Sequence, residues 1–408
     1  MSKVAPQQLA VFGGAPEFDR PLHVGAPNIG DPQALLARIQ STLDRRWLTN
    51  DGPLAQEFER TVAQMVGVDH CIATCNATVA LEILARALDL TGEVLVPAFT
   101  FIATAHSLQW QKITPVFCDI DPMTFNVSPE DVVRKITPRT SGILAVHLWG
   151  RGCEIGRLQE IADAFGIPLI FDASHALGCT WGGRPIGSWG KAEVFSFHAT
   201  KFVNALEGGA ICTNDGELAQ RCRRMKNFGI AGPDHVVCVG TNGKMNEWSA
   251  AMGLTSLEAI DTIVETNRQH YEAYRRRLST ISGLRLLDFD QRERSNYQYV
   301  IVEVDASRTQ LDRDTIVRIL HAEGVLARRY FTPGCHRMEP YRSRKLPIDG
   351  PLPHTDFAAR TTMALPTGTA LTKDDVERVV NLLALMVRHG QEIRRQLAVA
   401  SPVKLRIA

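Results

Sequence analysis

Short apolar segments alternate with amphipathic segments over much of the first half of the chain. The apolar segments that predict strands are 71–75, 93–99, 114–121, 142–148 and 168–173. The amphipathic segments that predict helices are 78–90, 103–111 and 155–166. Continuous apolar strands that alternate with helices are typical of a parallel or mixed sheet covered on both faces. We therefore expect an α/β fold whose ligands bind beyond the carboxyl ends of the strands.

The pattern changes near residue 256. A charged amphipathic stretch at 257–281 predicts a long helix that leaves the first domain. The elements expected after it are a strand at 297–304, a helix at 312–324, a strand at 325–331 and a helix at 373–396. We therefore predict a large domain over residues 1–256, which includes the N-terminal segment, and a smaller α+β domain over residues 257–408.

Composition restricts the possible partners and the compartment. The 408 residues carry a formal net charge of +1, which argues against nucleic acid or an anionic membrane surface as the main partner. The nine cysteines are an odd number without a Cys-x-x-Cys pair, so we expect reduced thiols and neither a disulfide framework nor a metal site. The sequence has no membrane-length apolar segment and no apolar run near residue 1, which predicts a cytoplasmic protein.

Three segments carry candidate chemistry, and the first is the turn Asn76-Ala77-Thr78 between a strand and a helix. The first-turn amides of a helix have no partners within the helix and, with the helix dipole, can bind an anion. The Thr78 hydroxyl adds a possible donor. An ordinary helix cap explains the same residues.

The second segment is the apolar strand 168–173, in which Asp172 stands next to the end and His175 follows shortly after. A buried carboxylate needs a partner, and a protonated ring nitrogen of a cofactor would provide one. A capping aspartate and a neutral core histidine are the structural alternatives.

The third segment places Lys201 after an apolar strand at 192–197 that contains Ser196, and before Gly208 and Gly209. A lysine in apolar surroundings either extends its ammonium group to water or becomes neutral and nucleophilic. An anion site, a carboxylate and a nucleophilic lysine together are what pyridoxal 5'-phosphate (PLP) requires of a protein. The combination is more specific than any of its parts.

Five stretches resemble one known family. They are "CNATVALEIL", "VPAFTFIATA", "FDASHALGC", "FSFHATKFVNALEGGAICTND" and "NGKMNEWSAAMGL". They are similar to the PLP-dependent nucleotide-sugar aminotransferases of the DegT/DnrJ/StrS group, and the similarity runs from about residue 47 to residue 336. The resemblance implies an aspartate-aminotransferase-type fold (fold type I) and a homodimer with shared active sites.

The resemblance also implies roles for individual residues. Lys201 matches the Schiff-base lysine, which is also the general base and acid, and Asp172 matches the partner of the pyridine nitrogen. His175 matches a side chain beside the phenolic oxygen of the cofactor. Ala77 and Thr78 match the phosphate-binding turn, with alanine where many members have glycine.

Four further cofactor contacts follow from the same resemblance. Ser196 matches a hydroxyl that joins the phosphate site, and Phe101 matches a ring that stacks on the pyridine, although a core phenylalanine explains Phe101 as well. Asn242 and Lys244 match the segment that reaches the cofactor phosphate of the neighbouring subunit.

For the reaction, the resemblance implies transfer of an amino group from glutamate or glutamine to a nucleotide-linked keto-sugar. The branch most similar to this chain acts on dTDP-4-keto-6-deoxyglucose and forms the 4-amino-4,6-dideoxy sugar. A 3-keto-sugar or keto-cyclitol aminotransferase is the alternative enzyme, and a non-catalytic binding protein is the alternative of another class. Candidate substrate contacts are Thr49, Asn50, Arg329, Tyr330 and His336, and a solvated basic edge explains the last three equally well.

Overall fold

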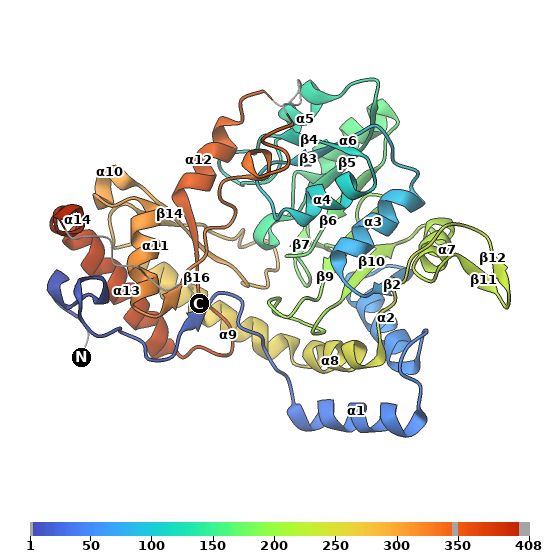
Figure 1. The fold of residues 1–408 in the computed structure, drawn as a ribbon, viewed down its shortest axis with the longest axis horizontal. Coiled ribbons are helices and arrows are strands. Elements are labelled where there is room, and N and C mark those ends of the chain that lie inside the picture. Colours follow the sequence, from blue (N-terminus) through green and yellow to red (C-terminus); the bar gives the residue numbers. More distant parts are fainter. Residues whose placement is uncertain (1–2, 345–349, 400–408) are drawn as a thin grey trace.

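A mixed seven-stranded sheet forms the centre of the larger part of the molecule (Figure 1). The computed structural model describes residues 3–344 and 350–399. The strands, in the order in which they lie side by side, are β2 (His70–Thr74), β10 (Gly209–Thr213), β9 (Ala192–Ser196), β6 (Leu169–Asp172), β5 (Thr140–Val146), β3 (Glu93–Pro97) and β4 (Thr114–Cys118). Neighbouring strands are parallel, except that β10 is antiparallel to both β2 and β9. The predicted α/β class with a large mixed sheet is confirmed.

Helices cover both faces of this sheet because its strands are apolar on both sides. In β2, Ile72 packs on one face, and Cys71 and Ala73 pack on the other. The helices on the Ile72 face are α3 (Ala77–Ala87), α4 (Ala103–Trp110) and α7 (Gly216–Met225). The helices on the opposite face are α2 (Pro53–Val66), α5 (Pro129–Lys135), α6 (Ile155–Phe165) and α8 (Glu247–Glu258). The helix α1 (Pro32–Arg45) lies outside α8 (Figure 1).

A smaller unit follows along the helix α9 (Ile260–Leu278), which continues from α8 (Figure 1). Its sheet is antiparallel and contains β13 (Leu284–Leu286), β14 (Val300–Val304) and β16 (Thr362–Leu365). Its helices are α10 (Ala306–Thr309), α11 (Arg313–Ala322), α12 (Pro353–Thr361), α13 (Lys373–Arg388) and α14 (Gly390–Val399). Leu9, Phe18 and Leu22 near the N-terminus pack into the core of this smaller unit. The proposed division at residue 256 stays a prediction.

Short elements complete the fold. The two-stranded pairs are β1 (Leu22–His23) with β15 (Val325–Leu326), β7 (Thr180–Trp181) with β8 (Arg184–Pro185), and β11 (Ile230–Gly232) with β12 (His235–Val236). The 3-10 helices are η1 (Pro6–Gln8), η2 (Ala10–Phe12), η3 (Leu148–Gly150) and η4 (Cys335–Arg337). Over the described ranges, no helix combines the length and the apolar character that crossing a bilayer requires.

Several element predictions were wrong in their bounds, and three differ most. The strand expected at 325–331 ends at Leu326, where its pairing with β1 stops, and Arg328 then forms an isolated antiparallel bridge with Ala364. The helix expected at 257–281 is interrupted at Ala259, which lies between α8 and α9. The helix expected at 373–396 is divided at His389 into α13 and α14.

Candidate active site

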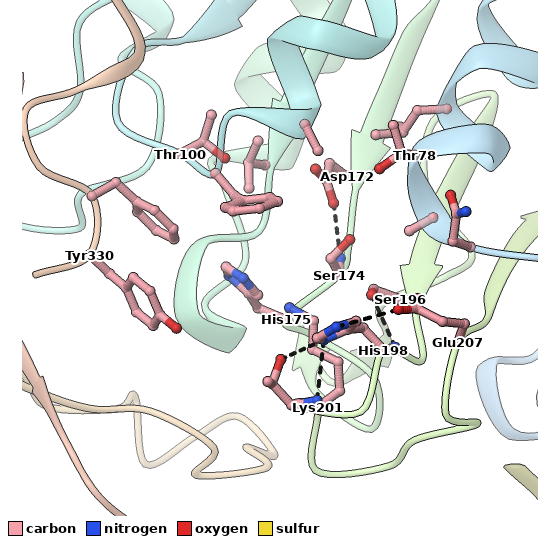
Figure 2. Close-up of a pocket in the computed structure, with 18 of the residues that line it drawn as sticks. Thr78, Thr100, Asp172, Ser174, His175, Ser196, His198, Lys201, Glu207 and Tyr330 are labelled. Carbon is pink, nitrogen blue, oxygen red and sulfur yellow. Dashed lines mark hydrogen bonds and ion pairs between the residues drawn. The ribbon is translucent and has the colours of Figure 1, made fainter. Parts of the chain in front are cut away.

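A cavity of about 550 Å³ lies at the carboxyl ends of the central strands (Figure 2). The larger domain contributes the turn before α3, the turn before α4, the ends of β6 and β9, and the loop that carries Lys201. The smaller unit contributes Tyr299, Tyr330 and Phe331. The cavity therefore lies between the two units and occupies the place that strand polarity predicts.

The turn before α3 presents backbone amides on one wall of the cavity. The Asn76 side chain accepts a hydrogen bond from the Val79 amide at 2.9 Å, so the predicted helix cap is present. The backbone amides of Ala77 and Thr78 precede the hydrogen-bonded part of the helix and remain available to a ligand. Gly209 permits this arrangement, because a Cβ at that position would lie 2.6 Å from the Ala77 nitrogen.

Asp172 is buried at the end of β6 and is held by two donors. The Thr104 hydroxyl donates to its Oδ2 at 2.8 Å, and the Ser174 amide donates to its Oδ1 at 3.1 Å. Both oxygens retain acceptor capacity, and the residue lines the cavity. The arrangement presents a fixed carboxylate to a cationic group in the cavity.

Lys201 lies in a tight turn after β9, where its amide donates to the His198 carbonyl at 2.8 Å. Its side chain lines the cavity (Figure 2). Burial lowers the pKa of the Lys201 amine to about 8, against the attraction of Asp172, which raises that pKa. The amine therefore has a larger neutral, nucleophilic fraction at neutral pH than an exposed lysine has.

His175 is fixed from three sides. The backbone N–H of Trp149 donates to its Nδ1 at 3.2 Å, and the Asn296 side chain donates to its carbonyl at 2.9 Å. The rings of Tyr299 and Phe331 pack against the imidazole, with centroid distances of 4.7 and 6.1 Å. Burial, assisted by the positive charge of Lys201, holds the pKa of His175 well below its usual value.

The structure brings most of the predicted cofactor residues together. In Figure 2, Thr78 and Tyr330 lie on opposite sides of a central group formed by Asp172, Ser174 and His175. The other predicted residues that line the same cavity are Ala77, Phe101, Ser196 and Lys201. Tyr330 is the predicted substrate contact that shares this cavity.

The structure places other predicted residues elsewhere. Asn50 and Lys244 line a second hollow of about 150 Å³, where the Lys244 amine donates to Asn227 at 3.0 Å. The segment that contains Asn242 and Lys244 lies beside the turn before α3 of its own chain, since the Gly243 carbonyl accepts from the Cys75 amide at 2.8 Å.

The other three proposed substrate contacts do not line the cavity. Arg329 is exposed and pairs with Asp314 at 3.3 Å. His336 pairs with Asp356 at 3.2 Å instead of facing the cavity. Thr49 is exposed on the loop between α1 and α2.

Sequence reasoning missed several residues that line or support the cavity. They are Thr104, Ser174, His198, Glu207, Tyr299 and Phe331. His198 and Glu207 lie in the same sequence motif as Lys201, so their place in that motif could have indicated that they line the cavity. Tyr299 and Phe331 reach the cavity through packing of the smaller unit, which leaves no local sequence signal.

The residues of the cavity fit PLP. An amide cradle suits its phosphate, a fixed carboxylate suits its pyridine nitrogen, and a partly neutral amine suits its aldehyde. These three groups line one cavity large enough for the cofactor and part of a substrate.

Comparison with known proteins identifies the same chemistry. Residues 31–384 match the model of the DegT/DnrJ/EryC1/StrS aminotransferase family. The dTDP-4-amino-4,6-dideoxy-D-glucose transaminase of Escherichia coli is 33% identical over 367 residues, which are 90% of this chain and 98% of that protein. The GDP-perosamine synthase of Caulobacter vibrioides is 33% identical over 85% of this chain and 93% of that protein. A crystal structure of DesI in the presence of its TDP-sugar product is 50% identical with a TM-score of 0.93, covering 97% of this chain and 100% of that chain.

Proposed function

The chain belongs to the DegT/DnrJ/EryC1/StrS family of PLP-dependent sugar aminotransferases, and from this we propose that it aminates dTDP-4-keto-6-deoxyglucose. The proposed product is dTDP-4-amino-4,6-dideoxyglucose, and glutamate is the proposed amino donor. The observation that carries the proposal is the meeting of Lys201, Asp172 and the Ala77-Thr78 amides in one cavity. The choice of sugar rests on the 33% identity to the Escherichia coli transaminase. The 50% identity to DesI, whose structure was determined in the presence of its TDP-sugar product, supports a TDP-linked substrate.

We assign the chain's own residues the following roles. The amides of Ala77 and Thr78 and the hydroxyls of Thr78 and Ser196 bind the cofactor phosphate. Asp172 holds a proton on the pyridine nitrogen through opposite charge at close range. Phe101, whose side chain lines the cavity and is 56% exposed, covers one face of the cofactor ring.

Lys201 carries the proton transfers of the reaction. PLP, when bound, supplies an electron sink for the carbon that loses its proton. With PLP bound, the Lys201 Nζ would be the group that takes up the proton lost by the amino donor and gives it back during the transfer. A pKa of about 8 suits both directions near neutral pH, because a substantial fraction of each protonation state is present.

We also propose a cytoplasmic homodimer with shared active sites. The free thiols of the chain suit a reducing compartment. Leu36 and Leu43 on α1, and Trp47 and Leu48 after it, are 45–57% exposed. Large apolar side chains gathered along one helix and the adjoining loop are typical of a surface that a second copy covers.

A second candidate substrate differs from the first in its nucleotide. The GDP-perosamine synthase is as identical to this chain as the Escherichia coli transaminase is, at 33%. A GDP-linked keto-sugar is therefore the second candidate substrate. Purified enzyme, glutamate and a panel of dTDP- and GDP-linked 3- and 4-keto-sugars distinguish these possibilities when the aminated carbon is located by nuclear magnetic resonance (NMR).

The aminotransferase assignment has its own test. We expect the purified protein to absorb in the visible region, and borohydride to fix the cofactor to Lys201 in a peptide identified by mass spectrometry. We expect Lys201→Ala to fold but to lose turnover, whereas the matched variant Lys112→Ala, at an exposed lysine, retains it. Wild-type turnover in Lys201→Ala would refute the role of the amine.

A further inference from the structure

The backbone around Trp149 has an unusual conformation next to the cavity. Trp149 has φ 55° and ψ 28° although it is not glycine, and its side chain is buried. Non-glycine residues adopt this left-handed conformation rarely and usually where the surrounding structure requires it. The consequence here is that the Trp149 backbone N–H points at the Nδ1 atom of His175, at 3.2 Å.

Asn126 holds the loop in this conformation. Its side-chain oxygen accepts from the Leu148 amide at 3.0 Å, and its side-chain nitrogen donates to the Gly152 carbonyl at 2.9 Å. Asn126 is buried, so a side chain unable to make these bonds would leave backbone groups unpaired. The side-chain amide of Asn126 therefore fixes the loop on both sides of Trp149.

This contact determines which ring nitrogen of His175 carries a proton. A backbone N–H only donates, so Nδ1 must accept and cannot hold a proton of its own. The neutral ring then carries its proton on Nε2, for which the described residues provide no acceptor. A flipped ring would leave the buried Trp149 N–H facing a carbon atom, and packing by Tyr299 and Phe331 further restricts the ring.

We propose that the Trp149 loop locks His175 as its Nε2–H tautomer, so that His175 is a permanent hydrogen-bond donor to the cavity and not a proton carrier. The titratable groups around the ring are Lys201, Asp172, Tyr299 and Tyr330. Lys201 opposes a positive charge on His175, and burial raises the pKa of both tyrosines, which keeps them neutral. In this arrangement Trp149 and Asn126 are positioning residues, and proton transfer is left to Lys201.

NMR of the cofactor-free protein labelled with ¹⁵N in its histidine rings tests the tautomer without any assay of activity. The His175 signals are assigned by their loss in His175→Gln. We expect Nδ1 to appear as an unprotonated ring nitrogen and Nε2 as a protonated one, both unchanged from about pH 5 to pH 8, where an ordinary histidine titrates. A protonated Nδ1, or titration within that range, would overturn the proposal.

Two variants test the role of the loop. Asn126→Leu removes the bonds that hold the loop, so we expect His175 to show mixed tautomers or to titrate. Trp149→Phe keeps the backbone N–H, so its histidine spectrum should match the wild type. An unchanged fixed tautomer in folded Asn126→Leu would contradict the role of the loop; if this variant does not fold, the wild-type spectrum still decides the tautomer.

The consequence for catalysis rests on the proposed function and is measured separately. A glutamine side chain can place an N–H near the Nε2 position, whereas the shorter asparagine places it near Nδ1. We therefore expect His175→Gln to retain kcat about tenfold or more above His175→Asn, the effect of one hydrogen bond to a polar group. If both variants lost kcat equally while the wild-type NMR spectrum showed the fixed tautomer, the hydrogen bond from His175 would not contribute to catalysis. The proposed tautomer would still stand.

Discussion

The reactivity of Lys201 should report its buried environment directly, in the absence of cofactor. Burial lowers its pKa to about 8, whereas an ordinary lysine has a pKa of about 10.4. At pH 7 about one Lys201 amine in eleven is then neutral, compared with about one in 2,500 for an ordinary lysine, a ratio of roughly 200. Because the neutral amine attacks aldehydes, Lys201 should react about 200 times faster per site at this pH if access is equal.

Reductive methylation with formaldehyde and cyanoborohydride measures this reactivity, since formaldehyde is small and has no ring for Asp172 to recognise. We expect the extent of modification of the Lys201 peptide to rise with pH to a half-maximum near pH 8. The exposed Lys112 in the same digest serves as the internal reference.

Asp172→Asn provides the decisive perturbation, because the carboxylate raises the pKa of Lys201. Its removal should lower that pKa further, so methylation of Lys201 at pH 7 should become faster even though the variant loses the proposed transamination. A half-maximum near pH 10 in the wild type, or slower methylation in Asp172→Asn, would refute the electrostatic reasoning.

Three further outcomes follow from the structure. Lys201→Met in the cofactor-free protein should raise the free energy of unfolding at pH 7 by up to about 3 kcal/mol, because the folded state of the wild type must bury a protonated amine whose pKa is lowered to about 8. The gain should shrink as the pH rises from about 8 to 10.4, because the wild-type amine is then neutral in the folded state. Urea unfolding at several pH values measures both effects. Thr104→Val removes a donor to Asp172 and should weaken PLP binding about tenfold in an absorbance titration, and unchanged affinity would contradict that support. Leu36→Asp should give monomers in sedimentation velocity, whereas Phe165→Asp, at a similarly exposed residue, should not.

The sequence predicted the parts of the site that depend on local patterns. Asn76, Asp172 and Ser196 stand at or just beyond the ends of apolar strands, and parallel strands bring such ends to one edge. Tyr299 and Phe331 were not predicted because their approach to His175 depends on how the smaller unit packs against the sheet. Long-range packing of this kind has no periodicity that one segment could reveal.

Two of the proposed substrate residues lie outside the cavity for a related reason. Charge and aromatic character alone suggested Arg329 and His336, but each is paired with a nearby carboxylate on its own side of the fold. A basic residue is available to a ligand only when local acids do not already neutralise it, and the sequence does not state those pairings. Tyr330 lines the cavity whereas its neighbour Arg329 is exposed, at a turn in which the Thr332 amide donates to the Arg329 carbonyl at 2.8 Å.

The charges of the cavity favour the proposal that a second copy completes the site. Among the described residues that line it, Lys201 is the one lysine or arginine, and Asp172 and Glu207 are acidic. The proposed ligands are anionic: a cofactor phosphate, glutamate and a nucleotide diphosphate. A cation from outside the cavity would offset these negative charges, which favours the proposal that Lys244 serves the site of a second copy.

Lys244 suits that role because no carboxylate neutralises it within the described part of the chain. Its amine contacts Asn227 and lies over the Phe228 ring at 4.5 Å, whereas neighbouring Lys226 is paired with Glu59 at 2.9 Å.

Mixed dimers test this directly. A dimer of one Lys201→Ala chain and one Lys244→Ala chain, isolated with two different affinity tags, contains one intact site if Lys244 acts across the interface, because the Lys244→Ala chain keeps its Lys201 and receives Lys244 from its partner. We expect that dimer to recover activity that neither parent homodimer shows. If Lys244 acts within its own chain, both sites of the mixed dimer are defective, and an inactive mixed dimer would contradict the shared site.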